Sequence, residues 1–215
     1  MIAFNVRASI SDDIIQFIRS GNYEALILEL MNQSTKFFPH QYVRNEDQSD
    51  GQCDFIDVQS GEKYEAKLVF TEKDGQLLAG KQRDFRGWVA LQHAQEAEFS
   101  ECISERGIHG VENLSLFKTM NDLMGKIEDD ENVIFFIPYP IALDSKDMVF
   151  TQFASDILSA VADQLKKLGH MSQREVYAIY PGMNHEMVIR RLKNGVREYI
   201  DGTAIEKYIK YDFWL

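Results

Sequence analysis

The stretch that decides the fold is "CDFIDVQSGEKYEAKLVF", residues 53–70. Apolar and polar residues alternate on both sides of Ser60-Gly61, which predicts two short antiparallel strands joined by a tight turn. A loop of those two residues would set Asp54 directly opposite Lys67, with Glu65 diagonal to Asp54. Because side chains alternate between the faces of a strand, all three charged residues would share one face. The hairpin therefore gathers charged side chains where uncharged ones would pack at lower cost.

The other face of the predicted hairpin holds Phe55, Asp57, Tyr64 and Ala66. The same short loop opposes Asp57 with Tyr64. A slip of one residue in the register would turn one strand over and separate the acids on the charged face. The grouping of the charged side chains thus depends on the length of the loop.

Two carboxylates and an ammonium group on one sheet face suit a hard divalent cation. Mg²⁺ takes few protein oxygens, keeps several waters and accepts phosphate oxygens. A cation bound there lowers the pKa of its water and neutralises charge on a scissile phosphate. Lys67 would orient or help deprotonate that water, or stabilise the transition state. The alternative is an ordinary ion pair between Lys67 and Asp54 or Glu65 at a partly wet surface, worth at most about 1 kcal/mol.

The rest of the chain shows an order of elements typical of an α/β protein. Periodicity, caps and breakers predict helices over residues 11–21, 22–38, 81–99, the second half of 107–127, 145–169 and 183–200. Strands are expected over residues 40–46, 132–141, 174–182 and 205–215. The strand at 132–141 is too apolar on both faces to lie at a sheet edge. This order predicts a single α/β domain with a mixed central sheet flanked by helices on both faces.

Composition places the chain among globular proteins. Its 215 residues are 45% hydrophobic and 12% aromatic, which is enough to bury a core. No run of about eighteen apolar residues predicts a membrane span, and the first residues lack the pattern of a secretory signal. Cys53 and Cys102 form neither a disulfide framework nor a zinc spacing. A cytoplasmic protein without a membrane partner is therefore expected.

The net charge of −11 bears on the partners. A general nucleic-acid coat would be basic. A nuclease is compatible with an acidic chain, because charge acts locally and metal-binding carboxylates add to the total. The acidic runs at 45–50 and 128–131 are expected to be solvated loops.

Basic and imidazole side chains are the remaining candidates for function. The basic residues form two local stretches, which are Lys81, Arg83 and Arg86, and then Arg190, Arg191, Lys193 and Arg197. Both stretches are candidates for contacts with phosphates; the alternative is a solvated helix face balanced by nearby acids. The five histidines show no pair at metal-ligand spacing and are expected to be structural or surface residues.

The hairpin residues resemble a nuclease signature. Asp54, followed after ten residues by "EAK" at 65–67, is similar to the motif of the PD-(D/E)XK nuclease superfamily, which has the restriction-endonuclease-like fold. "GNYEALILELM" at 21–31 resembles that family's glycine–aromatic–Glu pattern on the first core helix, whose Glu, here Glu24, often faces the metal. The predicted order of helix, three strands, helix and strand over 22–140 is also the order of that family.

The resemblance covers about the first two-thirds of the chain. It implies a single nuclease-like domain over 1–215, with a restriction-endonuclease-like core at about 11–140 and a C-terminal α/β extension at about 141–215. Cys53 stands where the name-giving proline would be, a departure that many members share. A second acid-x-Lys triplet, "DSK" at 144–146, lies at a predicted helix start without a partner acid and is set aside.

The resemblance implies a metal-dependent nuclease, with DNA favoured over RNA as the substrate. Asp54 and Glu65 would bind Mg²⁺ or Mn²⁺, and Lys67 would position the attacking water. Glu24 and Gln82 would assist the site, although both are equally compatible with a plain helix surface. Sequence specificity would come from loops, a homodimer or a protein partner.

Two other functions stay open. A non-catalytic, nuclease-like subunit of a larger nucleic-acid-processing or defence complex is favoured by the negative charge. An unrelated α/β enzyme or binding protein would have its pocket at the carboxyl ends of the strands at 132–140 and 175–181. Metal titration separates the first alternative from a nuclease. In the second, changing Glu65 or Lys67 leaves the activity intact.

Overall fold

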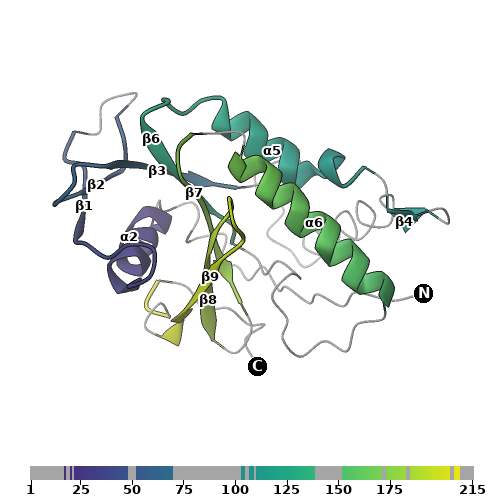
Figure 1. Cartoon of the computed structure of the whole chain (residues 1–215). Helices are drawn as coiled ribbons and strands as arrows, with labels where there is room; N and C mark the ends of the chain where they lie inside the picture. Colours follow the sequence, from purple (N-terminus) through teal and green to yellow (C-terminus); the bar gives the residue numbers. More distant parts are fainter. Residues whose placement is uncertain are drawn as a thin grey trace.

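The computed structural model describes residues 17, 20, 22–47, 52–69, 103–104, 107–108, 110–138, 152–170, 173–182, 185–203 and 206–208 (Figure 1). The first elements are α2 (Tyr23–Gln33), β1 (Tyr42–Arg44), β2 (Phe55–Asp57) and β3 (Lys63–Leu68). They are followed by β4 (Ile103–Ser104), β5 (Gly107–Ile108), a 3-10 helix (Val111–Asn113) and α5 (Ser115–Met124). The last elements are β6 (Glu131–Phe136), α6 (Gln152–His170), β7 (Val176–Pro181), β8 (Glu186–Arg191) and β9 (Arg197–Asp201).

Seven strands form one mixed sheet in the order β1-β2-β3-β6-β7-β8-β9. Strands β3, β6 and β7 run parallel, and the other neighbours are antiparallel. The predicted α/β class with a mixed central sheet is therefore confirmed. β6 lies in the middle of the sheet, as the apolar sequence at 132–141 predicts. None of the helices within the described ranges has the length and apolar character of a membrane span.

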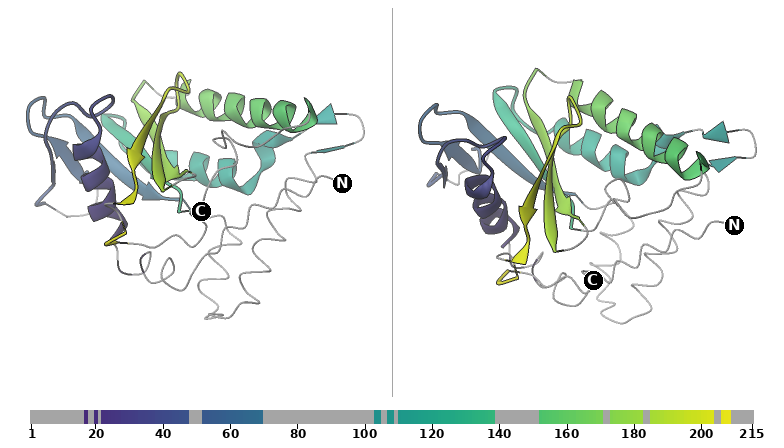
Figure 2. Two further views of the ribbon diagram at one scale, coloured as in Figure 1. Left: turned by 90° about the horizontal axis from the view of Figure 1, so that it is seen from below. Right: turned by 60° about the horizontal axis from the view of Figure 1, so that its bottom comes forward.

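Helices cover the sheet on both faces (Figures 1 and 2). α2 lies against one face, where its Leu26 is buried in the same cluster as Phe55 of β2. α5 and α6 cover the other face, where Phe117 and Leu165 are buried in the same cluster as Val133 of β6. Because β6, β7 and β8 are covered on both sides, their residues are buried almost without interruption.

Aromatic rings join the segment after α2 to the sheet. Phe38 is 1% exposed, and its ring centroid lies 5.5, 5.8 and 4.9 Å from those of Tyr42, Tyr64 and Tyr177. The rings meet edge-on or tilted, the arrangements that aromatic pairs favour. One buried side chain thus connects β1, β3 and β7.

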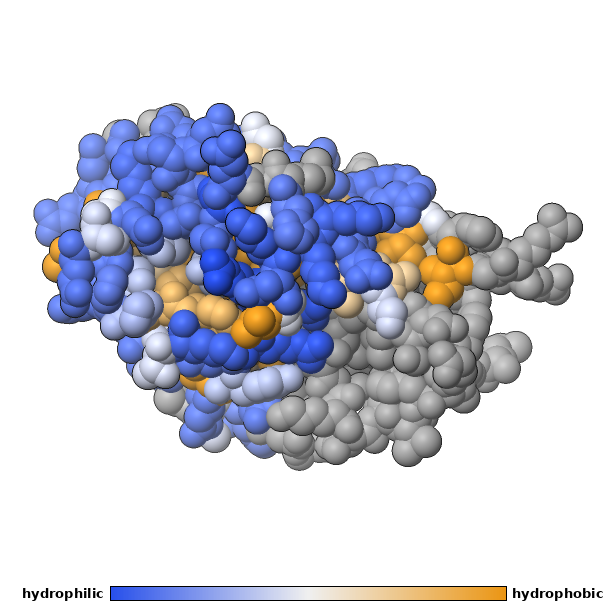
Figure 3. All heavy atoms as spheres, viewed as in Figure 1, coloured by the Kyte–Doolittle hydropathy of each residue, from blue (hydrophilic) through white to orange (hydrophobic). Residues whose placement is uncertain are grey.

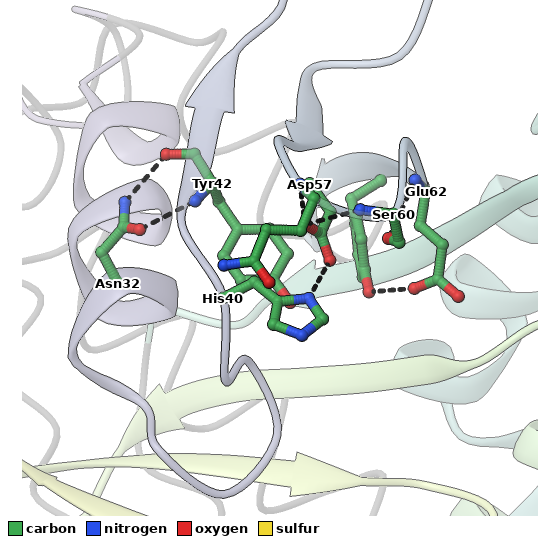
Figure 4. A network of polar contacts seen from close by, with 8 residues as sticks. Asn32, His40, Tyr42, Asp57, Ser60 and Glu62 are labelled. Atoms are coloured by element: carbon green, nitrogen blue, oxygen red, sulfur yellow. Dashed lines mark hydrogen bonds and ion pairs between the residues drawn. The ribbon is translucent and has the colours of Figure 1, made fainter.

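The end of α2 is also held by polar contacts. Asn32 Oδ1 accepts a hydrogen bond from the Tyr42 N–H at 2.9 Å, and Asn32 Nδ2 donates to the Tyr42 carbonyl at 3.1 Å (Figure 4). The Glu198 carboxylate of β9 accepts from the Thr35 N–H at 3.1 Å and from the Ser34 hydroxyl. The two edge strands of the sheet, β1 and β9, therefore both bind the C-terminal end of α2.

Polar side chains dominate the described surface, as Figure 3 shows for one face. The large hydrophobic side chains exposed within the described ranges are Val43, at 39%, and Val58, at 56%. The acidic run at 128–131 is exposed through Asp130, as predicted. The prediction is wrong for Glu131, which begins β6 and is 3% exposed. Burial raises the pKa of the Glu131 carboxyl.

The prediction of a helix over 183–200 is wrong. The segment forms β8 and β9, joined by a turn at Asn194-Gly195 in which the glycine has a φ of 68°. Residues 187–190 are all buried because both faces of β8 are covered. A strand of this kind lacks the alternation of a half-buried strand, and its apolar run is easily taken for a helix. The Asn-Gly pair between two such runs is the hairpin signal in this segment.

The hairpin of 53–70 forms with a longer loop than predicted. β2 and β3 are joined by residues 58–62, in which Gly61 has a φ of 75°. Asp57 Oδ1 accepts hydrogen bonds from the N–H groups of Gln59, at 2.8 Å, and Ser60, at 3.2 Å. Carboxylates of Asp commonly fix turns in this way. The prediction of a two-residue turn at Ser60-Gly61 is therefore wrong, because the Asp57 side chain stabilises a wider loop.

The longer loop changes the pairing but preserves the faces. Tyr64 pairs with Phe55 across the two strands, whereas the predicted partner of Tyr64 was Asp57, two residues further along. An even slip leaves every side chain on its predicted face and changes the residue opposite to it. The pairing of β2 with β3 ends at Phe55, and beyond it the Asp54 N–H donates to the Tyr64 carbonyl at 3.1 Å, so the Asp54 backbone lies beside Tyr64 and not beside Lys67. The predicted opposition of Asp54 and Lys67 is thus wrong.

Most other predicted elements are present with shifted ends. α2 ends at Gln33, before the proline at 39 that was expected to stop it, and α6 extends to His170. The short helix expected within 107–127 is α5, and the strands expected over 40–46 and 174–182 are β1 and β7. The segments 81–99 and 144–146, and most of 11–21 and 205–215, lie outside the described residues.

Candidate metal site

The three charged residues of the hairpin lie together at the start of β2 and on one face of β3. Asp54 immediately precedes β2, and its Oδ2 accepts a hydrogen bond from the Ala66 N–H at 2.8 Å. Glu65 and Lys67 follow one another on the same face of β3 and form an ion pair. The structure therefore brings Asp54, Glu65 and Lys67 to one part of the sheet, with the two acids adjacent.

Glu65 is the more enclosed member of its ion pair. Its side chain is 13% exposed, against 29% for Lys67. Glu65 Oε1 faces the Lys67 ammonium, whereas Oε2 is buried and has no hydrogen-bond donor among the described residues. A buried polar atom without a partner raises the free energy of the folded state. A cation is one group that would satisfy this oxygen.

The charge around Asp54 is also incompletely neutralised. Burial raises the pKa of the Asp54 carboxyl to about 7 from its usual value of 3.8. The Ala66 N–H opposes this rise, the negative charges of Glu65 and Glu24 add to it, and Lys67 again lowers the pKa. Of the described charged groups that act most on Asp54, two carboxylates raise its pKa and one ammonium group lowers it. Such an excess of negative charge favours a bound cation.

Glu24 belongs to the same electrostatic neighbourhood. It lies in the first turn of α2 and forms an ion pair with Arg44 of β1. Burial, followed by the negative charges of Glu24 and Asp54, raises the pKa of the Tyr23 hydroxyl to about 12. The negative charge of Glu24 therefore acts on the hairpin acids, although Glu24 already has Arg44 as its counter-charge.

The described residues hold no group of three or more His, Cys, Asp or Glu side chains placed to hold a metal ion. A site at the hairpin would use the carboxylates of Asp54 and Glu65 and complete its coordination with water or substrate oxygens. This donor set fits Mg²⁺, which commonly takes one or two protein carboxylates and keeps several waters. It does not fit a structural zinc site, which needs four protein ligands.

The second basic stretch does not form one surface. It lies on the β8–β9 hairpin instead of a helix, so neighbouring residues point to opposite faces. Arg190 is 2% exposed. Arg191 faces the other way and is bound to Glu175, with Nε 2.6 Å from Oε2. Lys193 is exposed and Arg197 is half-buried. The helix expected for this stretch is therefore replaced by β-structure, and its predicted contacts with phosphates stay a prediction.

The other basic stretch lies outside the described residues. It comprises Lys81, Arg83 and Arg86. Gln82, which was expected to assist the site, lies there too, so its predicted role stays a prediction.

Sequence reasoning missed a second polar network on the hairpin. His40 Nδ1 lies 2.6 Å from Asp57 Oδ2 (Figure 4). Asp57 is 2% exposed, whereas His40 is 37% exposed. Burial alone would raise the pKa of Asp57, but hydrogen bonds from His40 and from the N–H groups of Gln59 and Ser60 lower it to about 2. Asp57 is thus a buried carboxylate with donors on both of its oxygens.

The network extends through tyrosine hydroxyls. Tyr64 donates to Glu62 Oε2 at 2.9 Å, and burial followed by the charge of Asp57 raises the pKa of Tyr42. One sequence signal for the network exists, because Asp57 falls on the apolar face of the predicted hairpin and a buried acid needs a partner. No spacing rule points to His40, which lies 17 residues earlier.

The Asp57 network and the Asp54–Glu65 group lie on opposite faces of the hairpin. They differ in whether their carboxylate oxygens have hydrogen-bond donors. Asp57 is fully hydrogen-bonded on the α2 face, whereas Glu65 on the other face keeps one buried oxygen without a described donor. Of the two, the Asp54–Glu65 group is the one that a cation would complete. Comparison with models of protein families, with curated proteins and with solved structures found no match for this chain.

Proposed function

We propose that the chain is a metal-dependent phosphodiester hydrolase acting on DNA, with its active site at Asp54, Glu65 and Lys67. The observation that carries the proposal is the pair of adjacent, partly buried carboxylates, one of which has an oxygen without a donor among the described residues. The raised pKa of Asp54, caused by burial and then by neighbouring negative charge, supports the same conclusion. The expected cation is Mg²⁺ or Mn²⁺.

Each hairpin residue has a role in this chemistry. Asp54 and Glu65 hold the cation, which when bound supplies Lewis acidity and neutralises charge on the phosphate. Lys67 orients the attacking water and stabilises the negative charge that develops on the phosphate oxygens. The water oxygen bonds to phosphorus, one P–O bond breaks, and the water proton is transferred to the departing alkoxide. The reaction proceeds in one step without a covalent enzyme intermediate.

The order of elements supports a restriction-endonuclease-like core. The described chain runs α2, β1, β2 and β3, then the two-residue strands β4 and β5 and a 3-10 helix, and then α5 and β6, so the longer elements come in the order helix, three strands, helix and strand. Asp54 stands at the start of the second strand, and Glu65 and Lys67 stand on the third. Glu24, on the first of these helices, adds negative charge to the same site.

A second candidate is a non-catalytic subunit with the same fold. Two observations favour it. The net charge is −11, and Lys67 is already paired with Glu65. An acidic surface disfavours binding to free DNA, and a paired lysine is typical of a structural ion pair.

Metal binding and DNA cleavage test the proposal together. Mn²⁺ affinity is measured by calorimetry, and cleavage of plasmid and single-stranded DNA is measured with Mg²⁺ or Mn²⁺, for the wild type, Glu65→Ala and Lys67→Ala. Matched controls are Asp130→Ala and Lys63→Ala. Lys63 lies on the same face of β3 as Lys67 and forms an exposed ion pair with Asp130 at 3.0 Å.

The nuclease proposal expects a wild type that binds Mn²⁺ and cuts DNA. Glu65→Ala should lose both properties, Lys67→Ala should bind the metal without cutting, and both controls should behave as the wild type. Circular dichroism establishes that each variant is folded. A wild type that neither binds Mn²⁺ nor cuts either DNA contradicts the nuclease and favours the non-catalytic subunit.

A further inference from the structure

The ion pair between Glu65 and Lys67 joins the acid that would hold the cation to the lysine that would act on the attacking water. The two residues stand two positions apart on one face of β3, and the Lys67 ammonium contacts Glu65 Oε1. The Glu65 and Lys67 side chains are 13% and 29% exposed, so solvent screens this pair less than one at the open surface. One carboxylate oxygen of the proposed ligand set thus already has a positive charge beside it.

The other oxygen of Glu65 offers no separate route to a cation. Oε2 is buried and has no hydrogen-bond donor among the described residues. A cation that arrives from solvent therefore meets Glu65 at Oε1, where the Lys67 ammonium lies. Two positive groups in contact with one oxygen repel each other strongly, so the ammonium must leave when the cation binds. Lys67 is the more exposed partner and has a flexible stem, which lets its ammonium move into water.

Asp54 lies against the same part of β3. Its Oδ2 accepts a hydrogen bond at 2.8 Å from the N–H of Ala66, the residue between Glu65 and Lys67. A cation held by Asp54 and Glu65 would therefore stand close to the Lys67 ammonium in its present position. By contrast, Lys63 on the same face of β3 is bound to Asp130 at 3.0 Å, and both of those side chains are exposed. Competition with a cation is thus expected of Lys67, and Lys63 serves as its control.

We propose that Lys67 regulates the metal site as an internal competitor, because its ammonium occupies Glu65 until it is displaced by a divalent cation. This inference rests on the proposed function, since it needs a cation at Asp54 and Glu65. A hydrogen bond between charged partners is strong, so breaking the pair lowers the net affinity for the cation. The displaced ammonium is then free to orient the attacking water. Lys67 would therefore act only at a site that already holds its metal.

Metal affinity in the absence of DNA is the first test. Calorimetric titration with Mn²⁺ compares the wild type with Lys67→Met, which keeps the length of the side chain and removes its charge. The matched control is Lys63→Met, and circular dichroism establishes that each variant is folded. Lys67→Met should bind Mn²⁺ about tenfold more tightly than the wild type, or better, because no ion pair has to be broken. Lys63→Met should stay within about threefold of the wild type, as expected for an exposed pair.

Chemical labelling of lysine is the second test, and it follows Lys67 in the wild type. An N-hydroxysuccinimide ester acetylates free amines, and mass spectrometry measures the rate at each lysine at one fixed pH, in EDTA and at increasing Mn²⁺ concentration. Labelling of Lys67 should be slow in EDTA, because the ion pair holds its ammonium. The rate should rise with Mn²⁺ until it saturates at the affinity found by calorimetry, whereas the rate at Lys63 should not change.

Equal Mn²⁺ affinities of the wild type and Lys67→Met overturn the inference and leave the proposed metal site standing. The same follows if Lys63→Met gains as much affinity as Lys67→Met, which would show a general effect of charge. If neither the wild type nor Lys67→Met binds Mn²⁺, the metal site itself is wrong and the inference falls with it. Binding of Mn²⁺ by Lys67→Met alone supports the inference, since the ion pair then keeps the cation out of the wild type. If Lys67→Met does not fold, the labelling decides, and a rate at Lys67 that Mn²⁺ leaves unchanged overturns the inference.

Discussion

The buried Asp57 carboxylate should make the stability of the protein depend on pH in a narrow acidic range. Its pKa in the folded protein is about 2, against a usual value of 3.8. At about 1.4 kcal/mol for each pH unit, this difference stabilises the folded state by about 2 kcal/mol. The stabilisation is present above pH 3.8, where Asp57 is ionised in both states, and is lost as the pH falls towards 2. By linkage about half of this stabilisation remains at pH 3 and little of it at pH 2.

Replacing Asp57 with asparagine isolates this contribution from those of other carboxyl groups. Asp57→Asn keeps the size of the side chain and mimics its neutral form. The free energy of unfolding of the variant should fall below that of the wild type by about 2 kcal/mol at pH 6, and the two should converge as the pH approaches 2. Urea unfolding followed by circular dichroism at pH 6, 4, 3 and 2, at constant ionic strength, measures the difference.

An exposed carboxylate provides the control for this prediction. Asp130 also has a lowered pKa, caused by its hydrogen bond and ion pair with Lys63, but its side chain is 62% exposed. Solvent screens such a pair, so Asp130→Asn should follow the wild type across the pH range. A difference between the wild type and Asp57→Asn that stays constant from pH 6 to pH 2 would refute the reasoning about the His40–Asp57 pair.

Substitutions at tightly packed positions give further expected outcomes. Gly169→Ala should lower the free energy of unfolding by about 1–3 kcal/mol, because its Cβ would lie 2.5 Å from the backbone nitrogen of Lys193. Gly125→Ala is the matched control, since its nearest contact is 3.7 Å away, and it should leave stability unchanged or raise it by up to about 1 kcal/mol. Gly61→Ala meets no atom within 4 Å but must adopt a φ of 75°, so it should cost about 1 kcal/mol. Phe38→Ala should cost about 3–5 kcal/mol by opening a cavity among the tyrosines. Urea unfolding measures all four, and a Gly169→Ala variant as stable as Gly125→Ala would contradict the packing argument.

Local patterns were sufficient for the elements whose sequences carry a clear period or a clear apolar run. α2 and α5 have one buried face each, and β6 has the uninterrupted apolar sequence of a central strand. β8 carries a similar apolar run, followed by arginines at 190 and 191 that suggest an amphipathic helix. What makes β8 a strand is the cover of a helix layer on each face, which is a property of the whole fold.

The hairpin site was partly predictable for a different reason. A shift in strand pairing by an even number of residues keeps every side chain on its face of the sheet. The predicted pairing was in error by two residues, so Asp54, Glu65 and Lys67 stayed on the predicted face. Which residue stands opposite Asp54 depends on the loop length, and that length is set by side-chain hydrogen bonds of Asp57. The contact of His40 with Asp57 arises only when the segment after α2 packs against the hairpin, and no local pattern encodes that packing.

The contact of Glu198 with Ser34 has a consequence for synthesis of the chain. The two residues are 164 positions apart. At about 5–20 residues per second, the ribosome adds the second partner about 8–33 s after the first. During that interval α2 and the first strands exist without the acceptor that binds the end of the helix. The final seating of α2 therefore waits until β9 has been made.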